Sequence, residues 1–231
     1  MHQKYFNKIK KIFTDYKPNS LYTKEVINRG FVYSEFQNKK LLFIGMNPSY
    51  IDNSPLESNS YNVENAVLGY KRHYGKFQEL VNDTVYQNDW TYIDLFFFRE
   101  TDQNKISNVI NSDVDFIISQ LNLTNEIINE INPEIIVVCN SGASNFIGIN
   151  NYDNKNNIWL GYNFIFDDEF GVEILNDISN KSILENKQIL PNLKNKPFIF
   201  SSTLTYLDNH NKKRLKWIIN RIGKKKIRNY S

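Results

Sequence analysis

The chain has 231 residues, of which 41% are hydrophobic, and this is enough for one α/β domain with a sizeable core. A net charge of +3 does not require nucleic acid as a partner, and the single cysteine, Cys139, excludes an internal disulfide, a cysteine-based zinc site and an iron–sulfur cluster. No apolar stretch reaches membrane-spanning length and the amino terminus lacks a signal-peptide core, so we expect a monomer in the cytoplasm with no membrane contact.

The amino-terminal third begins with two short amphipathic helices, predicted over 3–16 and 21–29. Residues 1–35 are therefore expected to form a helical extension of a single domain that covers 1–231. A run of apolar residues at 40–45 follows and predicts a strand buried on both faces, which is typical of a parallel sheet. The polar residues 50–62 then predict a loop, and a long loop after a strand is more often functional than accidental.

The middle of the chain alternates between helical and strand patterns. Helical spacing covers 63–82, a strand is predicted over 90–98, and an amphipathic helix over 113–131 ends at Asn132-Pro133. A further strand, 135–139, runs into a turn of small residues that opens another helix.

The last third begins with a predicted hairpin over 157–176, with strands at 158–162 and 164–166. A core strand follows at 198–200, and a closing helix contains Leu215 and Ile222. Strand–helix alternation of this kind predicts a three-layer α/β/α sandwich around a mostly parallel four-stranded sheet, with a β-hairpin insertion.

Small polar residues follow each predicted core strand. Asn47, Asp94, Asn140 and Ser201 stand at or just after the four strand ends. Parallel strands end at one edge of a sheet, which is where ligands bind in open α/β folds, so we expect these groups to converge on one pocket. Pro48 disfavours the helical region for Asn47 and should hold it extended at that edge.

Three segments carry a family resemblance. They are Gly45-Met46-Asn47-Pro48, then a helix with the aromatic Phe77 followed by Tyr92-Ile93-Asp94-Leu95-Phe96, and lastly 133–143 with its Gly/Ala-rich helix start. In order and spacing, over roughly 40–220, they resemble the uracil-DNA glycosylase superfamily, especially members whose first motif reads Gly-x-Asn-Pro. The resemblance implies that fold, and hydrolysis of the N-glycosidic bond of uracil or a related deaminated base in single- or double-stranded DNA, without metal or cofactor.

The resemblance also implies roles for individual residues. The amide oxygen of Asn47 would hold the attacking water, and Ser201 or Ser202 would donate a hydrogen bond to the departing base. The substrate would contact the first motif (Gly45, Met46 and Pro48), stack on Tyr50 or Phe77, and meet Asp94 and Arg99. Nearby basic residues would contact DNA, namely His210, Lys212, Lys213 and Arg214.

The chain departs from the family pattern at two positions. The last strand ends in Ser201-Ser202-Thr203, where the family usually has His-Pro-Ser or Asn-Pro-Ser, and Asp94 stands where the second strand usually has Asn. These departures favour an alternative, a non-catalytic member of the same fold that binds a nucleotide, nucleic acid or protein. A further alternative is a hydrolase of small nucleosides or nucleotides.

Several residues have a purely structural interpretation as well. Asn47 would cap a turn, Tyr50 would be an ordinary loop aromatic, and Phe77 would belong to the core. Asp94 and Arg99 would form an ion pair, and Ser201 to Thr203 would cap a turn or helix. The basic segment 212–228, which has no acidic residue, would be a solvated helix face instead of a phosphate-binding surface.

Overall fold

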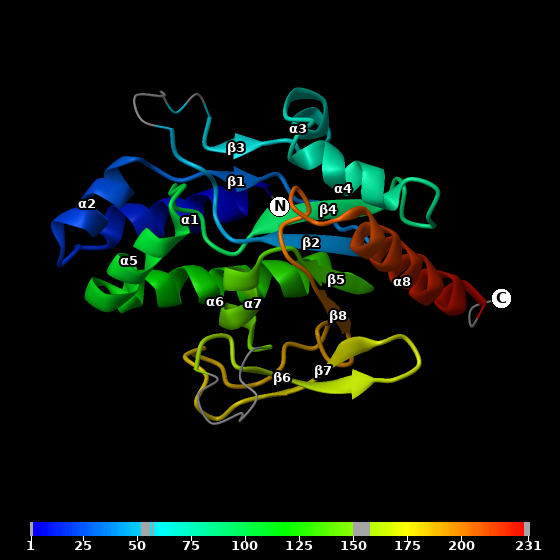
Figure 1. Ribbon diagram of the computed structural model, residues 1–231. Coiled ribbons are helices and arrows are strands. Elements are labelled where there is room, and N and C mark those ends of the chain that lie inside the picture. The colour runs from blue at the N-terminus through cyan, green and yellow to red at the C-terminus, as the bar shows by residue number, and fades with distance from the viewer. Residues whose placement is uncertain (1, 52–55, 57, 150–157, 229–231) are drawn as a thin grey trace.

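A six-stranded mixed sheet forms the centre of the protein in the computed structural model, which describes residues 2–51, 56, 58–149 and 158–228 (Figure 1). The strands lie in the order β4–β2–β5–β8–β7–β6. Their bounds are β2 Leu41–Gly45, β4 Trp90–Asp94, β5 Ile135–Val138, β6 Tyr162–Asp167, β7 Val172–Ile178 and β8 Pro197–Phe200. The α/β class and the mostly parallel core of the sheet are therefore confirmed.

The four core strands β4, β2, β5 and β8 are mutually parallel. β2 and β5 are runs of apolar residues buried on both faces, and β4 and β8 are mostly buried, as parallel strands between helical layers require. Gly45 pairs with Asp94, Ile44 with Val138, and Val138 with Phe200, so the carboxyl ends of all four strands lie at one edge. That edge carries the polar residues on which the predicted site depends.

Helices cover both faces of the sheet because alternate strand residues point to opposite sides. Leu42 and Ile44 pack in a cluster with α1 (His2–Asp15), α5 (Ile106–Ser112), α6 (Val114–Ile131) and α7 (Ser141–Ile147). Leu41 and Phe43 pack in a second cluster with α4 (Tyr74–Val81) and α8 (Asn209–Arg228). Figure 1 shows these two helical layers with the sheet between them.

The carboxyl-terminal part of the sheet differs from the prediction. The hairpin exists, but it joins the sheet: β7 pairs antiparallel with β8, and β6 forms the edge. The strand predicted over 158–162 is wrong, since β6 begins at Tyr162 and the chain turns at 168–171; residues 150–157 lie outside the described part. Apolar residues on both sides of the turn made the strand boundary ambiguous.

Other boundaries shift as well. The helix predicted over 63–82 is two helices, α3 (Val63–Gly69) and α4, and the strand predicted over 90–98 stops at Asp94, although Leu95 to Phe98 stay buried. Three features were not predicted from the sequence: α5, η1 (Gln103–Lys105) and a small parallel sheet of β1 (Tyr33–Ser34) and β3 (Ser60–Tyr61). Residues 52–55 and 57 of the predicted loop over 50–62 lie outside the described residues.

The predicted helices over 3–16 and 21–29 correspond to α1 and α2 (Leu21–Asn28). The α1 helix packs against α6, and α2 against α5. Within the described residues, none of the helices combines the length and the apolar character needed to cross a membrane.

Candidate functional site

Asn47 lies just beyond the end of β2, and its side chain is fixed by two backbone carbonyls. The amide nitrogen donates to Pro48 O at 3.0 Å and to Glu100 O at 2.6 Å. Because both partners only accept, they determine which end of the amide faces them. The opposite end, Oδ1, is buried and has no hydrogen-bond partner among the described residues. Asn47 therefore presents an oriented, unsatisfied acceptor at the carboxyl edge of the sheet.

The segments after β2 and β4 are joined by backbone hydrogen bonds that continue the parallel pairing. Leu95 N donates to Gly45 O, Phe96 N to Met46 O and Glu100 N to Pro48 O, at 2.9 to 3.1 Å. These bonds hold Asn47 against the chain that leaves β4, so its orientation is a property of the sheet edge and not of a free loop. Met46 itself is buried in the core.

Glu100 connects this loop to the amino-terminal helices. Its carboxylate accepts hydrogen bonds from Arg29, at 2.6 Å, and from the Tyr22 hydroxyl. Arg29 and Glu100 form an ion pair with side chains only 9% and 6% exposed. Burial alone would raise the pKa of Glu100, but these hydrogen bonds and the Arg29 charge lower it below its usual value. The carbonyl that fixes Asn47 thus belongs to a residue fastened by a buried ion pair.

Tyr50 and Arg99, both predicted substrate contacts, belong to the same network. The Tyr50 ring centroid lies 4.4 Å from the Arg29 guanidinium and 5.2 Å from that of Arg99, and Arg99 donates to Arg29 O. The ring that was expected to stack on a base is engaged by two cations in this arrangement. The alternative of an Asp94–Arg99 ion pair is wrong, because among the described residues these side chains do not pair.

Asp94 ends β4 beside Gly45 and is only 5% exposed. It accepts a hydrogen bond from the Tyr92 hydroxyl at 2.6 Å, and burial raises its pKa to about 7. A Cβ on Gly45 would lie 1.9 Å from the Tyr92 hydroxyl and 2.5 Å from Asp94 Oδ1. Glycine at 45 thus makes room for this acid, which is poised between its two protonation states near neutral pH.

An aromatic cluster surrounds Asp94 on the α4 side of the sheet. The Tyr74 hydroxyl donates to that of Tyr61 at 2.8 Å, and burial raises the pKa of both. His73 packs edge-on against Tyr74 and Tyr92, and burial lowers its pKa. This cluster was not predicted from the sequence, because its tyrosines come from β3, α4 and β4 and meet only through the fold.

Phe77 does not face a ligand. Its side chain is 2% exposed, and its ring lies 5.0 Å from that of Phe43 and 5.1 Å from that of Tyr92. Helical spacing with Leu80 and Val81 turns it toward the sheet. The prediction that Phe77 stacks on a base is corrected accordingly, and the core interpretation holds.

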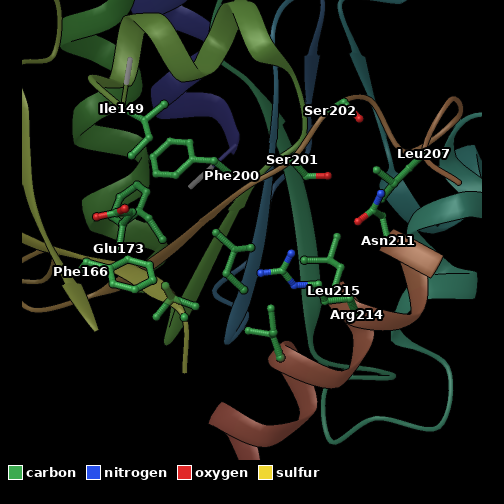
Figure 2. Close-up of a pocket in the computed structure, with 15 residues that line it drawn as sticks. Ile149, Phe166, Glu173, Phe200, Ser201, Ser202, Leu207, Asn211, Arg214 and Leu215 are labelled. Atoms are coloured by element: carbon green, nitrogen blue, oxygen red, sulfur yellow. The ribbon is translucent and has the colours of Figure 1, made fainter. Parts of the chain in front are cut away.

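Ser201 and Ser202 lie at the same edge but line a different space. A cleft of about 370 Å³ opens between β7, β8 and α8, and Figure 2 shows Arg214 extending into it from α8, with Glu173 on the opposite wall. Asn47 and Asp94 are not among its lining residues. With strands about 4.8 Å apart, β8 is roughly 10 Å from β2 and 14 Å from β4. Asn47 and Asp94 thus stand at the ends of neighbouring strands, β2 and β4, whereas the serines follow β8, which is separated from β2 by β5.

The predicted DNA contacts all lie on the first turns of α8. His210, Lys213 and Arg214 are exposed, and Arg214 lines the serine cleft. Lys212 and Lys213 line a separate groove against α4. Among the described residues, no group of three or more His, Cys, Asp or Glu is arranged to hold a metal ion.

Comparison with known proteins does not assign the chain to a family. Its sequence matches no protein-family model, and no curated protein matches it.

Proposed function

We propose that this protein is a DNA base-excision glycosylase with a uracil-DNA glycosylase-like fold, which hydrolyses the N-glycosidic bond of uracil or a related deaminated base. The observation that carries the proposal is Asn47, whose Oδ1 is an oriented, unsatisfied acceptor at the carboxyl edge of a parallel sheet. The order of the polar strand ends along four parallel strands supports the fold.

In the proposed reaction, a water molecule donates a hydrogen bond to Asn47 Oδ1 and presents its oxygen to the sugar carbon that carries the base. A carbon–oxygen bond forms, the carbon–nitrogen bond breaks, and the base leaves with the bonding electron pair. The water loses a proton to solvent and the departing base takes one up. Asn47 cannot act as a base, so it contributes by orienting the water.

Asp94 is the proposed contact for the base. Because its pKa is about 7, a fraction of the molecules carries a protonated Asp94 at neutral pH, and the acid then offers both a donor and an acceptor. An amide has the same pair of functions, which accounts for a carboxyl where the resembled family has Asn. Gly45, with no side chain, leaves the space in which Asp94 and Tyr92 lie.

The second candidate is a non-catalytic nucleic-acid-binding protein of the same fold. It is favoured by the end of β8, where Ser201 and Ser202 provide hydroxyls and no imidazole, while His210 is exposed on α8. A hydroxyl stabilises a departing anionic base less well than an imidazole does. Both candidates use the same sheet edge, so an activity assay separates them.

The test is incubation of the protein, in excess, with single- and double-stranded oligonucleotides that carry uracil, hypoxanthine or xanthine, followed by detection of abasic sites. The glycosylase proposal expects release of at least one base. Tight binding without release from any substrate would reject it in favour of the non-catalytic candidate.

A further inference from the structure

A second groove, distinct from the serine cleft, lies between α4 and α8 and encloses about 260 Å³. It is lined by Lys76, Glu79, Leu80, Leu204, Asn209, Lys212, Lys213 and Lys216. These residues come from two helices that are far apart in sequence and from the segment that follows β8, so the fold itself brings the lysines together.

The groove carries an excess of positive charge that the protein neutralises only in part. Lys76 pairs with Glu79 at 2.8 Å, and Lys216 pairs with Asp83, which is 88% exposed, at 3.3 Å. Such exposed pairs contribute little to stability and exchange readily for another anion. Among the described residues, neither Lys212 nor Lys213 takes part in an ion pair. Four ammonium groups thus face one acidic lining residue.

The chemistry of the lining favours phosphate over other anions or bases. Lysine ammonium groups are point charges on flexible stems, suited to phosphate without strict geometry. The apolar lining residues, Leu80 and Leu204, are aliphatic, and among the residues that the structure describes no aromatic ring lines the groove for a base to stack on. Lys212 and Lys216 are one helical turn apart, about 6 Å along α8, so the charges form a row and not a single point.

We propose that the groove between α4 and α8 binds successive phosphate groups of a nucleic-acid strand. The proposal rests on the function proposed above in taking a nucleic acid as the ligand, and it adds the path of the backbone. Leu204, in the wall of the groove, closely follows Ser201 and Ser202, so a strand held there leads toward the carboxyl edge of the sheet. In this proposal the groove contacts only the charged backbone, and the bases are recognised at the edge of the sheet.

The experiment measures binding of an undamaged, fluorescently labelled single-stranded oligonucleotide by anisotropy over a range of salt concentrations. The double variant K212Q/K213Q is compared with K10Q/K11Q, which removes the same charge from exposed positions on α1, a helix of the opposite layer. The logarithm of the binding constant falls linearly with the logarithm of the salt concentration. For a single strand, each lost phosphate contact makes this slope less steep by about 0.7. We expect K212Q/K213Q to make the slope less steep by about 1.4 and to weaken binding about 25-fold at 0.1 M salt, with K10Q/K11Q near wild type.

Equal effects of the two double variants would overturn the proposal, because the attraction would then be one of net charge only. It would also be overturned if the wild-type protein bound vesicles of anionic phospholipid but not the oligonucleotide. Failure of the glycosylase proposal is a separate outcome: the wild-type protein would release no base, while the difference in slope between the two double variants would persist.

Discussion

Replacing Gly45 with alanine tests the packing around Asp94. The new Cβ would lie 1.9 Å from the Tyr92 hydroxyl and 2.5 Å from Asp94 Oδ1, in a part of the sheet buried on both faces. Both groups must move. Overpacking a core costs about 1–3 kcal/mol, and disturbing the buried Tyr92–Asp94 hydrogen bond adds about 1–3 kcal/mol. We therefore expect Gly45→Ala to lower the free energy of unfolding, measured by urea denaturation, by about 2–6 kcal/mol.

The control is Gly69→Ala at the exposed end of α3, where an added Cβ meets nothing within 4 Å. Alanine is the better helix former, so this variant should be unchanged or more stable by up to about 1 kcal/mol. In a Tyr92→Phe background, which lacks the hydroxyl, Gly45→Ala should cost about 1 kcal/mol less. A Gly45→Ala variant within 0.5 kcal/mol of wild type, or strict additivity with Tyr92→Phe, would refute the reasoning.

Two further predictions concern charged groups. Burial raises the pKa of Asp94 from 3.8 to about 7, so the native state holds a proton that the unfolded state releases above pH 4. Wild-type stability should therefore fall relative to Asp94→Asn as pH rises from about 4 through 7 and level off above; a difference independent of pH in urea unfolding would contradict this. Arg29→Met leaves Glu100 buried without its partner and should cost about 3 kcal/mol, against less than about 1 kcal/mol for Lys8→Met in the exposed Lys8–Glu126 pair. Similar unfolding midpoints for these two variants would show that the Arg29–Glu100 pair adds nothing.

The central sheet was predictable because its core strands are short buried segments made mostly of apolar residues. β2, β4 and β5 are four or five residues long and nearly all buried, and this pattern needs no tertiary information. Two-residue strands such as β1 and β3 have no pattern to detect. The hairpin was predicted, but the bounds of its first strand were wrong for a different reason: β6 alternates weakly, with Ile165 and Phe166 both exposed, so its boundaries depend on pairing with β7.

For the candidate site, the sequence predicted which edge of the sheet carries the polar residues, but not how they are arranged along it. Parallel topology placed the ends of β2 and β4 at one edge, and the two strands are neighbours there. It did not reveal that β5 stands between β2 and β8, which separates Asn47 from the serines. The partners of Glu100 and Tyr50 come from the amino-terminal helices, and contacts between segments so distant in sequence leave no local signal.

The rate of base release by Asn47→Ala under single-turnover conditions tests the central claim, that Asn47 Oδ1 holds the reacting water. The comparison is with wild type and with Asn108→Ala, which removes the same amide from an exposed position on α5. On the substrate that wild type cleaves best, Asn47→Ala should be slower by at least about 100-fold while oligonucleotide binding is retained, and Asn108→Ala should match wild type. Release by a folded Asn47→Ala variant at the wild-type rate would contradict the claim.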